Sequence, residues 1–128
     1  MYLINDVLAV GSIFQTKPKM LYIDAVIGNI NDFKIIDVRM LNNRTPNPIQ
    51  DYTLNIMRVA SWLECHNKVV ICSSTGKSRA AAIAVGVLVK YFKMSFNQAL
   101  EVIKSKVPIA DIANLHILSL KQLFMVST

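Results

Sequence analysis

The stretch that decides the fold is residues 69–82, which read Val-Val-Ile-Cys-Ser-Ser-Thr-Gly-Lys-Ser-Arg-Ala-Ala-Ala. It opens with apolar, β-branched residues, as a buried strand does, and continues with small polar residues. The residues from Arg79 onward are apolar and favour a helix. A strand, a short polar loop and the start of a helix, in this order, predict an anion site, because backbone N–H groups converge at a helix N-terminus.

The residues of this loop suit an oxyanion such as phosphate. Gly76 permits a tight curl of the backbone, so that successive N–H groups can point at one ligand. Arg79 presents a planar guanidinium that can bind two phosphate oxygens, and Ser78 can hydrogen-bond within the loop to hold its shape. We therefore predict a phosphate-binding loop made of Ser73, Ser74, Thr75, Gly76, Lys77, Ser78 and Arg79.

The composition is that of one compact domain. The chain has 128 residues, 53% of them hydrophobic and 17% charged, with only four Gly and four Pro. These values exclude a disordered chain, and at this length residues 1–128 are predicted to form a single domain. No apolar run reaches the roughly 20 residues that cross a bilayer. The amino terminus lacks the pattern of a secretory signal, so we expect a cytoplasmic protein.

The charge balance favours anionic partners. Lysine and arginine number 14 against 8 aspartates and glutamates, which leaves a net charge of +6. Nucleic acid, anionic lipid and phosphorylated protein all fit this sign. The basic residues are spread along the chain without interleaved aromatic residues, so a dedicated nucleic-acid interface is not expected.

The cysteines and histidines indicate neither a disulfide nor a metal site. Cys65 and Cys72 are too few for a disulfide framework and are expected to be free thiols. His66 and His116 do not stand at ligand spacing from them, so no metal and no cofactor is implied. We expect His66 to lie in a turn and His116 on the surface of a helix.

The pattern of strands and helices predicts an α/β fold. Short β-branched runs predict strands at residues 7–10, 25–30, 34–39 and 69–71. Strands that alternate with helices imply a three-layer domain, with a mostly parallel central sheet of about four or five strands and helices on both faces. Ligands in such sheets bind beyond the carboxyl ends of the strands, where the loop after residue 71 lies.

Four helices are predicted in the part of the chain that follows residue 49. Residues 42–51, with Pro46 and Pro48, are expected to form an exposed loop, and apolar spacing predicts an amphipathic helix from about 50 to 65. The helix after Arg79 is apolar almost all round and should be central. Further helices are expected after Ser95, which forms a capping box with Gln98, and after Asp111.

On the evidence of these residues, the chain resembles the small dual-specificity protein phosphatases, which are cysteine-dependent. That family carries His-Cys-x-x-Gly-x-Ser-Arg-Ser followed by an apolar helix, and this sequence has Cys72-Ser73-Ser74-Thr75-Gly76-Lys77-Ser78-Arg79-Ala80. The resemblance extends to Val10-Gly11-Ser12, Met94-Ser95 and Asn114, and covers nearly the whole chain. It implies the fold of that family and a loop that binds phosphorylated groups.

Three catalytic roles of the family are vacant in this sequence. Ser73 stands at the position of the nucleophilic Cys, and a hydroxyl has a much higher pKa than a thiol. Asn42 or Asn43 stands at the position of the general acid Asp, and an amide cannot deliver a proton. Ala80 replaces the hydroxyl after the arginine. The resemblance therefore implies a pseudophosphatase, which binds phosphorylated proteins or peptides without hydrolysing them and is not an enzyme.

Several alternatives accompany this interpretation. Asp37 could be the missing acid, although it lies further from Ser73 than the family's acid does. Cys72 could be a displaced nucleophile, but alternation along a strand points it away from Ser73, so a buried, inert thiol is expected. Gly76-Lys77-Ser78 matches the end of an ATP-binding Walker loop, but Ile71 occupies the position of its first glycine.

Two other functions fit the same residues. The chain could be an active dual-specificity phosphatase captured as a Cys-to-Ser substrate-trapping variant, which explains Ser73 but neither the two asparagines nor Ala80. It could instead be a structural or dimerising protein whose loop is unused, and a homodimer fits that function. The excess of lysine over arginine, with abundant Ile and Asn, is typical of AT-rich genomes. Large DNA viruses are one candidate source, which would place the protein in the host cytoplasm or the virion.

Overall fold

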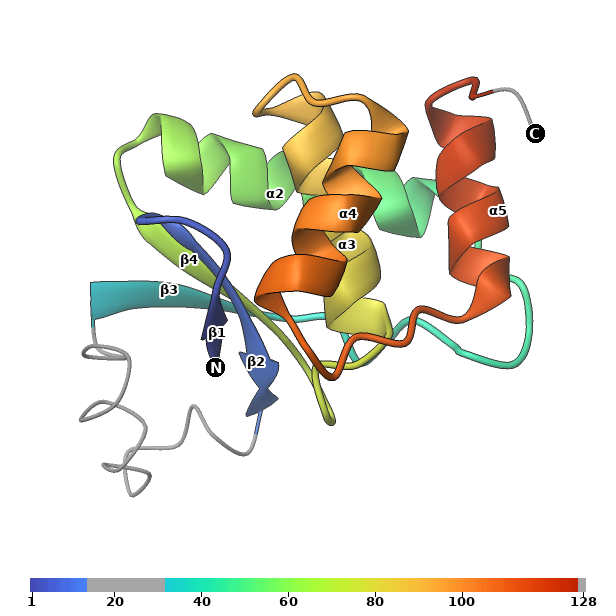
Figure 1. The fold of residues 1–128 in the computed structure, drawn as a ribbon, viewed down its shortest axis with the longest axis horizontal. Helices are drawn as coiled ribbons and strands as arrows, with labels where there is room; N and C mark the ends of the chain where they lie inside the picture. The colour runs from blue at the N-terminus through green and yellow to red at the C-terminus, as the bar shows by residue number, and fades with distance from the viewer. Residues whose placement is uncertain (14–31, 127–128) are drawn as a thin grey trace.

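The computed structural model describes residues 1–13 and 32–126, and among these it contains a four-stranded sheet (Figure 1). The strands are β1 (Tyr2–Leu3), β2 (Leu8–Ser12), β3 (Phe33–Asp37) and β4 (Lys68–Ser73), in the order β1-β2-β4-β3. The strands β2 and β3 each pair with β4 in parallel, and β1 pairs with β2 antiparallel. The mostly parallel sheet and the α/β class are therefore confirmed.

The strand predictions hold for three of the four runs. The runs at 7–10, 34–39 and 69–71 became β2, β3 and β4, each shifted or lengthened by one or two residues. The run at 25–30 lies outside the described residues. The two-residue strand β1 was not predicted, because a segment so short shows no alternation of apolar and polar residues.

The helices in the described part of the chain follow the predicted order. They are α2 (Ile49–Glu64), α3 (Arg79–Lys90), α4 (Phe96–Lys106) and α5 (Asn114–Leu123). Pro48 directly precedes α2, so this helix begins before the expected end of the loop at 51. The capping box of α4 is confirmed, since Ser95 Oγ accepts a bond from Gln98 N and Gln98 Oε1 accepts one from Ser95 N, both at 3.1 Å.

Side chains of the sheet enter two separate apolar clusters. The residues that alternate onto one face pack with the helices in the main core, and they are Leu8, Val10, Ile36, Val69 and Ile71. On the other face, Ala9, Val70 and Cys72 form a smaller cluster with Met1, which precedes β1. The helices of the described residues gather on the first face (Figure 1). Helices on the second face, which the sequence also predicts, are not among the described residues.

Helix α3 is the centre of the helical layer. Its residues from Ala80 to Leu88 are all buried, and it packs against α2, α4, α5 and the sheet. This confirms the central position that its apolar sequence predicts. Gly86 allows α2 to approach closely, because a Cβ at this position would meet Cδ1 and Cγ1 of Ile56, the latter at 2.8 Å.

We predict that Gly86→Ala lowers the free energy of unfolding by about 1–2 kcal/mol, because the added methyl overpacks the contact with Ile56 by more than the gain in helix propensity restores. Urea denaturation followed by circular dichroism measures this change. In an Ile56→Val background, which removes Cδ1, the same substitution should cost less. Equal costs in the two backgrounds would contradict the close approach.

Candidate functional site

The candidate site lies where three parallel strands end. Register pairs Ser12 of β2 with Ser73 of β4, and Asp37 of β3 with Cys72 of β4, so the carboxyl ends of these strands meet at one edge. The loop after β4 occupies this edge, and α3 begins at Arg79. The side chain of Ser12 donates to the carbonyl oxygen of Ser74 at 2.6 Å, which ties the loop to the neighbouring strand.

The loop curls around the hydroxyl of Ser73. This side chain is buried, and its Oγ accepts bonds from the backbone N of Gly76 at 3.1 Å and of Ala80 at 3.4 Å. Gly76 has a φ of 78°, and a Cβ there would lie 3.1 Å from the carbonyl of Gly11. The expected tight curl is therefore present, and only glycine suits its central position.

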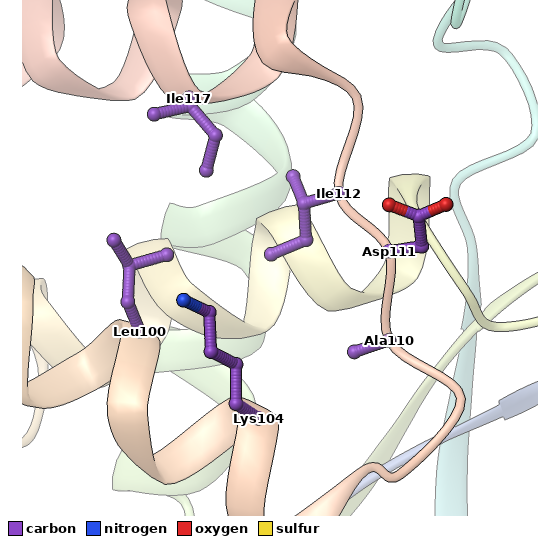
Figure 2. A pocket seen from close by; sticks show the side chains of 6 residues that line it. All are labelled: Leu100, Lys104, Ala110, Asp111, Ile112 and Ile117. Carbon is purple, nitrogen blue, oxygen red and sulfur yellow. The ribbon is translucent and has the colours of Figure 1, made fainter.

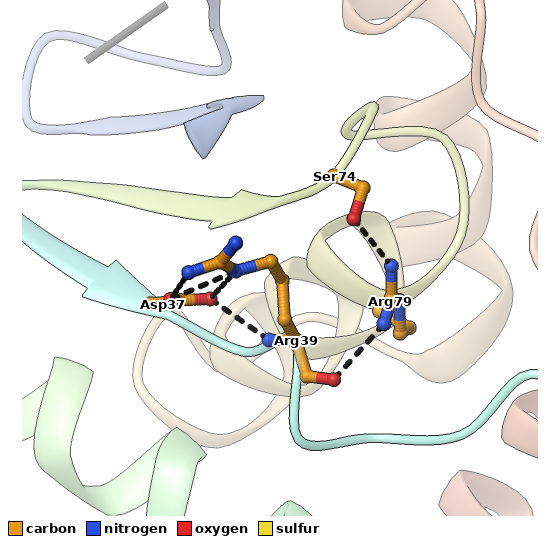
Figure 3. Close-up of polar contacts among 4 residues, drawn as sticks. All are labelled: Asp37, Arg39, Ser74 and Arg79. Carbon is orange, nitrogen blue, oxygen red and sulfur yellow. Dashed lines mark hydrogen bonds and ion pairs between the residues drawn. The ribbon is translucent and has the colours of Figure 1, made fainter. Parts of the chain in front are cut away.

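The guanidinium of Arg79 joins the loop to the segment after β3. Its Nη2 donates to Ser74 Oγ at 3.0 Å and its Nη1 to the carbonyl oxygen of Arg39 at 2.9 Å (Figure 3). The same Nη1 also donates to the carbonyl oxygen of Leu41 at 3.3 Å. These acceptors come from two segments far apart in the sequence. The cation is thus held at the edge of the loop by neutral acceptors, and its charge is not neutralised by them.

Ser78 differs from its predicted role. Its Oγ accepts a bond from the backbone N of Ala113 at 2.9 Å, and the neighbouring Lys77 carbonyl accepts one from Asp111 N at 2.8 Å. Ser78 therefore fastens the loop to the segment between α4 and α5. The sequence could not show this, because the partner is 35 residues away. Lys77 and Thr75 are exposed.

Asn42 and Asn43, which stand at the predicted general-acid position, shape the loop that precedes α2. The side chain of Asn42 accepts bonds from the backbone N of Arg44 at 2.7 Å and of Thr45 at 3.1 Å, which makes a tight turn. The side chain of Asn43 is bonded to His116 Nε2 at 2.7 Å.

His116 corrects a prediction, because it is completely buried and does not lie on a helix surface. Its Nδ1 lies 2.7 Å from Tyr52 Oη, and the same hydroxyl accepts a bond from Asn47 Nδ2 at 3.0 Å. Burial lowers the pKa of His116 to about 4, with a further contribution from the charge of Arg79. The alternation of apolar and polar residues in α5 is weak, and its sequence gives no sign of these distant partners. The burial of His116 could therefore not be predicted from the sequence.

The shifted pKa values of Asp37 and Cys72 argue against Asp37 as the general acid and Cys72 as the nucleophile. Asp37 forms an ion pair with Arg39 at 2.7 Å, and hydrogen bonding from that arginine holds the pKa of the carboxyl below its ordinary value (Figure 3). A carboxyl that is ionised in this way is a poor proton donor at neutral pH. Cys72 is buried in the second cluster, and burial, with the nearby Asp37 charge, raises its pKa to about 12. It is the inert thiol that strand alternation predicts.

A separate groove lies between α4 and α5. It has a volume of about 320 Å³ and is lined by Leu100, Lys104, Ala110, Asp111, Ile112 and Ile117 (Figure 2). The carboxylate of Asp111 points away from the amine of Lys104, and the remaining lining is apolar (Figure 2). One cation beside apolar side chains does not make an oxyanion-binding site, so this groove differs in chemistry from the loop at Ser73.

Comparisons with known proteins identify the fold. No family model and no curated protein matches the sequence. Among solved structures, human DUSP28 is 14% identical with a TM-score of 0.79, and the match covers 99% of this chain and 100% of that chain. The human tyrosine phosphatase-like serine/threonine/tyrosine-interacting protein is 15% identical with a TM-score of 0.79, and the match covers 98% and 96% of the two chains.

A protein from Entamoeba histolytica with leucine-rich repeats and a phosphatase domain is also similar. It is 21% identical with a TM-score of 0.76, and the match covers 99% of this chain and 95% of that chain. The fold of this protein is therefore that of the dual-specificity phosphatases, as its sequence resemblance implies.

These structures correct the prediction that the chain is not an enzyme. The matching structures with this fold include DUSP28, DUSP15 and a phosphatase domain, which point toward an enzyme. No comparison gives evidence of inactivity. The prediction, which rests on Ser73, Ala80 and the two asparagines alone, is wrong by this finding.

We predict that the buried His116 makes stability fall in acid. The unfolded chain binds a proton near pH 6.5 and the folded chain only near pH 4, so stability is present above 6.5 and is lost as the pH falls from 6.5 to 4. The free energy of unfolding should fall by about 3 kcal/mol over this window, beyond the change that carboxylates cause. Urea denaturation at a series of pH values measures it.

The matched control is His116→Gln, which can place an amide near Nε2 but does not titrate in this range. Its unfolding free energy should depend less on pH between 6.5 and 4 than that of the unaltered protein. Parallel curves for the two proteins would show that His116 is not the titrating group.

Proposed function

We propose that this protein binds phosphorylated side chains of other proteins in the loop of residues 73–79. The observation that supports this most directly is the arrangement of Arg79, whose guanidinium is held at the edge of the curled loop by Ser74 Oγ and two backbone carbonyls. None of these acceptors carries a charge. The cation therefore retains the positive potential that attracts a phosphate dianion.

The beginning of α3 adds to this potential. The first backbone N–H groups of a helix have no partner within it, and its dipole favours an anion at this end. The loop from Ser74 to Ser78 leads directly into this end, beside the carboxyl edge of the sheet. The exposed ammonium of Lys77 and the net charge of +6 favour the approach of an anionic partner.

A phosphorylated protein is the proposed partner class, because the sequence resembles the dual-specificity protein phosphatases and the fold is that of the dual-specificity phosphatases. One of the similar structures is named as a tyrosine phosphatase-like protein that interacts with serine, threonine and tyrosine. Cys65 and Cys72 are both free thiols, which suits the reducing cytosol in which we propose that the partner is met.

Hydrolysis is the activity toward which the fold points, and Ser73 is the residue from which attack on a bound phosphate would come. A serine hydroxyl without an adjacent base is a weaker nucleophile than a thiolate. Two backbone N–H bonds to Ser73 Oγ would nevertheless stabilise negative charge on that oxygen. Binding does not require this step to be fast, because the guanidinium of Arg79 and the start of α3 attract the phosphate whether or not Ser73 attacks it.

We predict that Arg79→Ala raises the dissociation constant for phosphotyrosine by about 10- to 100-fold, because a charge-assisted hydrogen bond contributes roughly 1.5–3 kcal/mol. Isothermal titration calorimetry with O-phosphotyrosine and with a phosphotyrosine peptide measures the change. Release of inorganic phosphate from the same samples, compared with Ser73→Ala, measures hydrolysis in parallel.

Arg58→Ala is the matched control, since it removes the same charge from the exposed surface of α2. It should leave the affinity nearly unchanged, and Arg79→Lys should lie between the unaltered protein and Arg79→Ala. If the unaltered protein binds neither ligand, or if Arg79→Ala binds as tightly as Arg58→Ala, the loop has no ligand role. A structural or dimerising function would then be favoured.

A further inference from the structure

We infer that the hydrogen-bonded network of Asn47, Tyr52, His116 and Asn43 positions Arg79 for phosphate binding. It does so by holding in place the segment of residues 39–47, whose backbone carbonyls accept the bonds of the guanidinium. These four side chains are positioning residues, since they act through Arg79. This inference rests on the proposed function and deepens it.

The hydrogen bonds of this network have one consistent order of donors and acceptors. Asn47 Nδ2 donates to Tyr52 Oη at 3.0 Å, so the proton of this hydroxyl is directed to His116 Nδ1 at 2.7 Å. His116 then carries its own proton on Nε2 and donates it to Asn43 Oδ1 at 2.7 Å. The imidazole is therefore neutral, in agreement with its lowered pKa. Every polar atom of Tyr52 and His116, both fully buried, has a partner.

The two asparagines at the ends of this network lie in the same loop and hold it in place. Asn43 is held by His116 of α5, and Asn47 is held by Tyr52 of α2. Asn47 also closes the loop on itself, because its Oδ1 accepts from Asn42 N at 2.7 Å and its Nδ2 donates to the Asn42 carbonyl at 2.9 Å. Two helices that pack against each other thus fix both sides of a short irregular segment.

The clamped segment leads directly to the acceptors of Arg79. Leu41 precedes Asn42, its side chain is buried, and its carbonyl oxygen receives Arg79 Nη1 at 3.3 Å. The Arg39 carbonyl receives the same nitrogen at 2.9 Å (Figure 3). A shift of residues 42–47 would therefore move these carbonyls and turn the guanidinium relative to Ser74. The charge of Arg79 also contributes to the lowered pKa of His116, so the two groups lie within electrostatic range.

A purely structural role for the four side chains predicts a different result from a positioning role. A structural role affects only the balance between folded and unfolded protein, so the folded fraction should bind phosphate with unchanged affinity. A positioning role affects the geometry of the folded site, so affinity should fall even where every molecule is folded. It should also fall only if Arg79 is present to be positioned.

The test uses Tyr52→Phe and Asn43→Ala, each alone and combined with Arg79→Ala, with inorganic phosphate and O-phosphotyrosine as the probes. We expect each single variant to raise the dissociation constant by about five- to tenfold, the equivalent of one lost hydrogen bond. In the Arg79→Ala background, the same changes should have no further effect. Calorimetry at a temperature where all variants are folded gives the affinities, and urea denaturation gives their stabilities.

Ile103→Val is the matched control, because it destabilises the core beneath α4 without touching the loop. It should lower stability and leave the affinity unchanged. If Tyr52→Phe and Asn43→Ala behave as Ile103→Val does, or if their effects persist without Arg79, the positioning role is refuted. That result would leave the proposed function intact provided that Arg79→Ala alone weakens binding and Arg58→Ala does not. If the unaltered protein does not bind either probe, the proposed function itself fails.

Discussion

The bonds from Arg79 to the carbonyl oxygens of Arg39 and Leu41 are the interaction on which the site depends. They join the first residue of α3 to the segment that follows β3, although the two are about 40 positions apart in the chain. They join the curled loop after β4 directly to the segment that leads into the loop before α2. With them, the two loops form one rim around the carboxyl end of the sheet.

The same arrangement explains how the positive charge of Arg79 stays available to an oxyanion although other groups surround it. Asp37, whose carboxylate lies within electrostatic range of Arg79, is already paired with Arg39 in a bidentate ion pair. Arg79 is instead held by a hydroxyl and two carbonyls, which orient it without cancelling its charge. An oriented but uncompensated guanidinium has little reorganisation to undergo when an oxyanion binds, and this favours binding.

A network of polar side chains supports this rim. Tyr52 and His116 are buried, and their outer partners are the side chains of Asn47, which is partly buried, and of Asn43, which is exposed. Leaving Tyr52 or His116 without a partner would be costly, so the network specifies a single conformation of the loop as well as stabilising it. Gly76 lets the curled loop approach Gly11, and Gly86 lets α3 approach Ile56 of α2; a side chain would block either approach.

The sequence by itself determined the local elements and the chemical character of the loop. The β-branched run before Cys72, the small residues after it and the apolar helix from Arg79 each specify their own conformation through near neighbours, and the capping box at Ser95 does the same. The parallel order of the strands followed from the alternation of strands and helices. The resemblance to the phosphatases likewise placed Ser73 and Arg79 in one cradle.

Only the tertiary structure decided the partners of the polar side chains. Ser78 bonds to Ala113 and not within its own loop, and His116 is buried although its helix has a weak apolar pattern. Asn43, one of the two asparagines that the resemblance places at the position of the general acid, bonds to that histidine across 73 residues. Such bonds depend on the packing of α2, α3 and α5 around the sheet. Short-range patterns carry no information about them, because hydrogen-bond partners are set by distance in space and not by spacing along the chain.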